Sequence, residues 1–247
     1  MDTQSKKVLV INLNKQETEI KAFTELNKFV GGVSLGRELA EMYAEHDPLI
    51  FSVGPLNGFF PFASKTSVLF DDHDLYLGGS LSVRIRFAGL DSIVLLGSLK
   101  NPTVLDITDG ETTFRHKDTD LGTLGLPGKR SVFNFSGHDL FLDEHFTTFN
   151  NLLSAKFINK NICGAVITGT KVFTVKDMER YQERYSHILS RIGEVEVKPG
   201  QNPSCSGCPL GCDKAKVGEN SGNTLVHSLV ACEYAKKIYS DIGVVFS

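Results

Sequence analysis

Three of the five cysteines in this 247-residue sequence are Cys205, Cys208 and Cys212. They are spaced C-x2-C-x3-C in a segment rich in Pro, Ser and Gly. Thiolates held this close on a tight loop can bind one soft metal centre, so the spacing indicates a metal or iron–sulfur site. Pro209 and the neighbouring glycines favour turns that aim the thiolates inward. The alternative, reduced surface thiols without a ligand, explains the clustering less well.

The number of ligands separates zinc from an iron–sulfur cluster. Structural zinc sites usually combine two short ligand pairs, and a single cysteine group is present here. A compact cysteine triple instead favours a [4Fe–4S] cluster, which takes a fourth thiolate from elsewhere. The candidates for the fourth ligand are Cys232, then Cys163 or His227, or a ligand from outside the chain. Cys232 also fits an apolar helix face, and Cys163 fits a small buried position beside a strand.

Composition argues against several classes of partner. The net charge is −3 and the isoelectric point about 6.2, so the chain has no general attraction for nucleic acid. No apolar run reaches the roughly 18 residues of a membrane span, so we expect no membrane partner. Clustered thiolates suit a reducing compartment, and we expect a cytoplasmic protein.

The sequence has no P-loop, G-x-S-x-G or H-E-x-x-H motif, which argues against a self-contained hydrolase.

The elements that must position the cysteines begin with strands. Short runs rich in β-branched and aromatic residues, separated by turn residues, predict a mainly β region. We expect strands over residues 7–13, 18–23, 49–53, 66–70, 81–87, 92–96, 103–108, 111–115, 131–135 and 164–168. The first two form a hairpin, and Asp109-Gly110 joins another. In residues 81–87, apolar side chains alternate with Ser82, Arg84 and Arg86, so we expect a strand with solvated arginines.

Helical patterns occur at three places. Residues 31–36 form a glycine-rich loop before a helix, with Ser34 as the expected N-cap. Such a loop can hold an anion on its free N–H groups, but it lacks the G-x-G-x-x-G spacing, so the glycines fit better as residues that permit the turn. After Thr174, which forms a capping box with Asp177, the helical pattern resumes, and a last helix is expected over residues 224–239. The sequence thus predicts an α+β protein, with a β-rich domain over residues 1–172 and a helical segment over residues 173–247 that carries the cysteine loop.

Six segments also carry a family resemblance, in the order that the family has them. They are Gly31–Gly36, similar to G-G-x-G-L-G; 47–58, similar to D-P-L…G-P-L-T-G; Gly78 and Gly79, followed by 86–97, similar to G-G…K-F-A-G-Y-D-x-I-V-x-x-G; 102–107, similar to P-V-x-x-x-I; and 205–212, whose second half is similar to C-P-x-G-C. On these residues the chain resembles the tungsten-containing aldehyde ferredoxin oxidoreductase family, in its N-terminal domain and first cluster-binding segment.

The resemblance implies a fold, a reaction and cofactor contacts. In that family a bis-pterin tungsten or molybdenum cofactor lies between the N-terminal domain and two helical domains. A [4Fe–4S] cluster beside it passes electrons from aldehyde oxidation to ferredoxin. The resemblance therefore implies cofactor contacts at Gly31, Gly32, Lys65, Gly78 and Gly79. It also implies cluster ligands at Cys205, Cys208 and Cys212, with Cys232 as the fourth.

Four departures bear on the pterin site. Residues 63–67 replace the family's G-G-R with a segment whose one basic side chain is Lys65, and residues 70–75 replace T-K-S-P-x-x-G. Residues 150–156 stand where the glycine-rich cofactor loop is expected, and residues 240–245 resemble a degraded D-x-x-G-L-D motif. We therefore expect either a fragment or a short family member with an altered pterin site.

Two hypotheses of function follow. The first is an iron–sulfur component that is inactive alone and serves a ferredoxin-like or catalytic protein partner, or an oligomer. The second is a noncatalytic zinc- or iron-binding assembly protein on the same scaffold.

Overall fold

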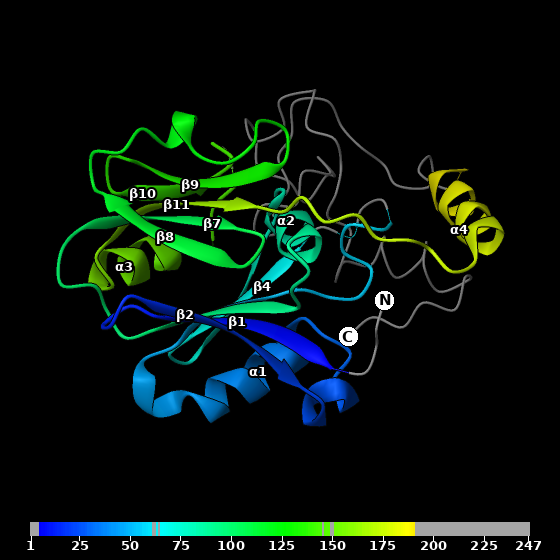
Figure 1. Ribbon diagram of the computed structural model, residues 1–247, viewed down its shortest axis with the longest axis horizontal. Coiled ribbons are helices and arrows are strands. Elements are labelled where there is room, and N and C mark those ends of the chain that lie inside the picture. Colours follow the sequence, from blue (N-terminus) through cyan, green and yellow to red (C-terminus); the bar gives the residue numbers. More distant parts are fainter. Residues whose placement is uncertain (1–4, 61–62, 64, 145, 149–150, 191–247) are drawn as a thin grey trace.

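Two β-sheets form the body of the protein in the computed structural model, which describes residues 5–60, 63, 65–144, 146–148 and 151–190. The first sheet has six strands in the order β2-β1-β6-β3-β4-β5, and the second has five in the order β10-β9-β11-β7-β8. Figure 1 shows the sheets as two layers, with α1 on the outer side of the first. This arrangement confirms the predicted α+β class with its mainly β N-terminal part.

The bounds of the elements are as follows. The first sheet contains β1 Lys6–Asn12, β2 Glu17–Phe23, β3 Leu49–Ser52, β4 Thr66–Phe70, β5 His73–Leu77 and β6 Ser92–Leu96. The second contains β7 Thr103–Thr108, β8 Glu111–His116, β9 Arg130–Ser136, β10 Asp139–Leu142 and β11 Ile162–Thr168. The helices are α1 Val33–Met42, α2 Leu81–Phe87, α3 Leu152–Asn159 and α4 Met178–Ser190, with short 3-10 turns at Glu25–Lys28, Ala44–His46 and Leu121–Thr123.

The first sheet is covered on both faces, which explains its continuous apolar strands. In β1, Leu9 and Ile11 face the second sheet, whereas Val8 and Val10 face α1. Strands β1 and β6 are parallel, and the predicted hairpins β1–β2 and β7–β8 are both present. The β7–β8 turn has Asp109 and Gly110 at positive φ, as a two-residue hairpin turn requires.

Residues 81–87 are a helix, so the predicted strand is wrong. Leu81, Ile85 and Ala88 recur at helical spacing and enter the core between the sheets. The alternating pattern that suggested a strand also contains Leu81 and Ile85, and a segment of seven residues is too short to separate period two from helical spacing. Arg86 is 3% exposed, so its predicted solvated environment is also wrong.

Two predicted helix starts also need correction. Gly32, at φ 58°, is the N-cap residue of α1, and the Ser34 hydroxyl donates a hydrogen bond to the Gly31 carbonyl instead of capping the helix. At α4 the cap is Asp177, whose carboxylate accepts a hydrogen bond from the Arg180 amide at 2.9 Å. Thr174 therefore lies before the helix.

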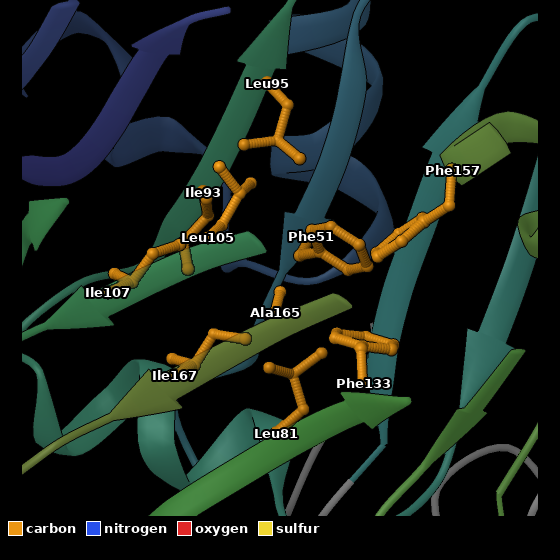
Figure 2. Close-up of a pocket in the computed structure, with 10 residues that line it drawn as sticks. All are labelled: Phe51, Leu81, Ile93, Leu95, Leu105, Ile107, Phe133, Phe157, Ala165 and Ile167. Atoms are coloured by element: carbon orange, nitrogen blue, oxygen red, sulfur yellow. The ribbon is translucent and has the colours of Figure 1, made fainter. Parts of the chain in front are cut away.

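Aromatic side chains fill the space between the sheets. The ring centroids of Phe133 and Phe157 are 5.1 Å apart, and Phe51 lies 5.6 Å from Phe133. They line a cavity of about 10 Å³ whose walls are all apolar, as Figure 2 shows. A water molecule there would have no hydrogen-bond partner, so this cavity is a packing defect and not a ligand site.

Replacement of Phe157 by alanine tests this core. Because Phe157 is fully buried against both sheets, we expect Phe157→Ala to lower the free energy of unfolding by about 3–5 kcal/mol. The control is Ile158→Ala on the same helix, because Ile158 is 51% exposed and its loss should cost little. Urea denaturation of both variants measures the difference, and equal losses would contradict the assigned orientation of α3.

Candidate functional site

The five residues implied as cofactor contacts come together at one end of the first sheet. The Gly32 amide donates a hydrogen bond to the carbonyl of Val53, just after β3. Thr66 pairs with Leu77 across β4 and β5, so Lys65 and Gly78 lie at this same end. We call the group of Gly31, Gly32, Gly54, Lys65, Gly78 and Gly79 the glycine edge.

A buried ion pair positions the glycine edge. The Arg86 guanidinium lies 2.9 Å from the Asp91 carboxylate and donates a second hydrogen bond to the Gly54 carbonyl at 2.8 Å. The other Asp91 oxygen accepts a hydrogen bond from the Lys7 amide at 2.9 Å. One side chain from α2 therefore joins the end of β3 to the start of β1. Sequence reasoning did not identify Arg86 as a positioning residue. The available signal was an acidic residue five positions later, Asp91, with which it could pair.

Asn57 closes the loop between β3 and β4. Its side-chain oxygen accepts a hydrogen bond from the Gly54 amide at 2.6 Å, and its side-chain nitrogen donates to the carbonyls of Ala63 at 2.7 Å and Lys65 at 3.3 Å. Asn57 is 4% exposed, so these bonds replace water that the loop backbone would otherwise need.

The glycines of this edge contact other parts of the protein closely. Gly31 and Gly78 are buried, and a Cβ on Gly31 would lie 2.7 Å from the Val53 carbonyl oxygen. A Cβ on Gly79 would lie 2.8 Å from the Phe146 ring and 3.0 Å from the Asp143 carboxylate. Gly31 and Gly79 are therefore needed for internal packing, because a side chain at either position would meet another part of the protein.

Lys65 provides one positive charge at the edge. It is half-buried, and its ammonium lies 5.7 Å from the centre of the Tyr76 ring. A lysine supplies a point charge, whereas an arginine could bind a phosphate through two parallel hydrogen bonds. Lys65 is thus a weak substitute for the arginine that the family resemblance implies.

The segment expected to be a cofactor loop leads instead into α3. On α3, the Lys156 ammonium lies 2.7 Å from the Asp71 carboxylate and also pairs with the Asp47 carboxylate. The Lys160 ammonium, just after α3, lies 2.8 Å from the Asp47 carboxylate and donates a hydrogen bond to the Gly97 carbonyl at 2.7 Å. Both ammonium groups are almost fully buried, and the two carboxylates are about half exposed. This lysine–aspartate cluster attaches α3 to the first sheet.

Burial and charge shift the pKa values of the cluster in opposite directions. Burial acts to raise the pKa of Asp47, but hydrogen bonds and positive charge from Lys156 and Lys160 outweigh it and lower that pKa. Burial acts to lower the pKa of Lys156, but Asp47 and Asp71 outweigh it and raise that pKa. For Lys160, burial dominates and lowers the pKa.

The predicted cluster ligands Cys205, Cys208, Cys212 and Cys232 lie outside the described residues. Cys163, the cysteine that the structure does describe, is half-buried on β11, and burial raises the pKa of its thiol. Within the described ranges, no group of three or more His, Cys, Asp or Glu side chains is placed to hold a metal ion. No described helix is long and apolar enough to cross a membrane.

Comparison with known proteins identifies the domain. Residues 8–128 match the profile of the aldehyde ferredoxin oxidoreductase N-terminal domain. This region of the chain belongs to that family. The Arg86–Asp91 pair and all six residues of the glycine edge lie within the matched residues, whereas α3 and its lysines follow them.

Two longer proteins are similar to this aldehyde ferredoxin oxidoreductase N-terminal domain. The first is "Aliphatic sulfonate oxidoreductase, WOR-like subunit" of Pyrococcus furiosus, 30% identical over 139 residues that cover 49% of this chain and 22% of that protein. The second is a solved structure, "Active site complex BamBC of Benzoyl Coenzyme A reductase in complex with 1,5 Dienoyl-CoA", with a TM-score of 0.66 and 17% identity. That match covers 85% of this chain and 37% of the solved chain, and at this identity it shows a common fold.

The Arg86–Asp91 pair should contribute strongly to stability. Because removal of one partner leaves a buried charge unpaired, we expect Arg86→Met to lower the free energy of unfolding by about 3–5 kcal/mol. Arg37→Met is the matched control, since Arg37 makes an ion pair of the same 2.9 Å length with Asp74 but is 71% exposed. Denaturant titration should show a loss below about 1 kcal/mol for the control; a similar loss for Arg86→Met would contradict the assigned role.

Acid should weaken the lysine–aspartate cluster. Since folding lowers the pKa of Asp47 below 3.8, its contribution is complete above that value and is lost as the pH falls through the folded pKa. We expect the stability of Asp47→Asn to fall less steeply than that of the parent protein between about pH 5 and pH 3. Asp118→Asn is the control, because Asp118 is exposed and its one recorded ionic neighbour is His116. Parallel slopes for Asp47→Asn and the parent would refute the assignment.

Proposed function

We propose that the chain is an iron–sulfur component of a tungsten or molybdenum pterin oxidoreductase, which transfers electrons for a catalytic protein partner and is inactive alone. The observation that carries this proposal is the match of residues 8–128 to the aldehyde ferredoxin oxidoreductase N-terminal domain, followed by the cysteine triple. The names of the two similar proteins support a partner: one is called a subunit, and the other is called a complex.

The cluster ligands in this proposal are Cys205, Cys208 and Cys212, with Cys232 as the fourth. Three soft thiolates at C-x2-C-x3-C spacing suit a [4Fe–4S] cluster, which would accept and release single electrons. A reducing compartment would keep the cysteines as thiolates, so we place the protein in the cytoplasm.

The pterin cofactor would require groups from the partner. The glycine edge has one point charge at Lys65, and its Gly31 and Gly79 backbones pack against the protein. These residues do not fit a pterin phosphate by themselves, so no step of pterin chemistry is assigned to this chain. Aldehyde oxidation by the purified chain with a viologen acceptor would contradict this view.

A second candidate is a noncatalytic assembly protein that binds zinc or iron. The observation that favours it is the helix α3, because its buried Lys156 lies within the segment expected to be a cofactor loop, and the buried Lys160 follows that segment. In this case the domain would keep its fold and its thiols without serving electron transfer.

Metal content distinguishes the two candidates. After anaerobic purification of the full chain, we expect a brown protein with roughly four iron atoms per chain and matching acid-labile sulfide. Reduction with dithionite should give an EPR signal of a reduced cluster. Cys208→Ser should lose the iron and keep the folded β domain, because the cysteine loop follows the sheets in the chain.

Cys163→Ser is the control, since Cys163 lies on β11 and should not affect iron content. A colourless protein with stoichiometric zinc would favour the assembly protein and reject the electron-transfer role. Loss of the whole far-UV circular dichroism signal in Cys208→Ser would show that the thiols also support the sheets.

A further inference from the structure

The Asp143 carboxylate binds the backbone directly after Gly78 and Gly79. One oxygen of Asp143, just after β10, accepts hydrogen bonds from the Ser80 amide at 2.8 Å and the Ser80 hydroxyl at 2.7 Å. The other oxygen accepts a hydrogen bond from the Val132 amide at 3.1 Å. The buried Ser131 hydroxyl contacts Ser80 and lies 3.5 Å from the same carboxylate.

These donors are the kind that proteins use to bind anions. Main-chain N–H groups and hydroxyls converging on one point suit a phosphate or a carboxylate. A positive charge is also near: burial lowers the pKa of Arg84, and the negative charge of Asp143 opposes that shift. Asp143 thus occupies the position that an external anion would need.

The backbone holds Asp143 in this place at some cost. Asp143 and Glu144 both have positive φ, at 51° and 63°, which is unfavourable for residues with a side chain. The turn is closed by a reciprocal pair of hydrogen bonds between Leu142 and Phe146, and the Phe146 ring packs against Gly79. Such a turn persists when the surrounding contacts determine it.

We propose that Asp143 is a built-in anion, which closes the Gly78–Gly79 part of the glycine edge to the phosphate of any external ligand. Asp143 lies beyond residues 8–128, in the part of the chain that the family profile does not match. The inference concerns phosphate and carboxylate binding and does not depend on the iron–sulfur role.

Removal of the carboxylate should create a site for a small external anion. We expect Asp143→Ala to lower the melting temperature of the full chain by roughly 5 °C. Sodium formate should restore at least half of this loss in a saturable way, compared with sodium chloride at equal ionic strength. Asp120→Ala is the matched control, because Asp120 also accepts a backbone hydrogen bond at 2.8 Å but on an exposed turn; its melting temperature should not respond saturably to formate.

Two results would overturn the inference. The first is a folded Asp143→Ala variant that formate does not stabilise. The second is saturable stabilisation of the unaltered chain by inorganic phosphate, which would show that the edge is still open; this titration decides the matter even if Asp143→Ala does not fold. Iron content measured on the same samples reports separately on the proposed function.

Discussion

The ion pair of Arg86 and Asp91 is the interaction on which the arrangement of the glycine edge depends. It joins α2, the end of β3 and the start of β1 through one guanidinium and one carboxylate. A buried charge is costly unless its partners are fixed, so the pair couples the positions of these three elements. The loop that Asn57 closes then begins from a defined point at Gly54.

Two backbone donors that could serve a ligand, one on this edge and one just after it, already have partners within the protein. The Gly32 amide is bonded to Val53, and the Ser80 amide is bonded to Asp143. Hydrogen-bond donors that are already satisfied gain little from an external anion. The scaffold of an aldehyde ferredoxin oxidoreductase N-terminal domain is therefore kept, and these two backbone donors are used within the protein.

The lysine–aspartate cluster explains how α3 is held against the sheets. Two ammonium groups that are nearly excluded from water meet two carboxylates that remain half exposed, so the charges balance without full burial of all four. A glycine-rich loop could not supply these contacts. Helix α3, anchored by these ion pairs, thus lies where the family resemblance leads us to expect a glycine-rich cofactor loop.

The sequence by itself determined the strands with strong β patterns, the β7–β8 turn at Asp109-Gly110, the α+β class and the family motifs, because these depend on local periodicity and turn chemistry. Strand β5, strand β10 and helix α3 were not predicted, since segments of four to eight residues are too short to show a clear periodicity. The helical state of residues 81–87 was decided by tertiary structure, because Leu81, Ile85 and Arg86 are buried together only when the two sheets and Asp91 surround them. The same is true of Asp143 and Lys156, whose partners are distant in sequence and become neighbours only after the sheets have packed.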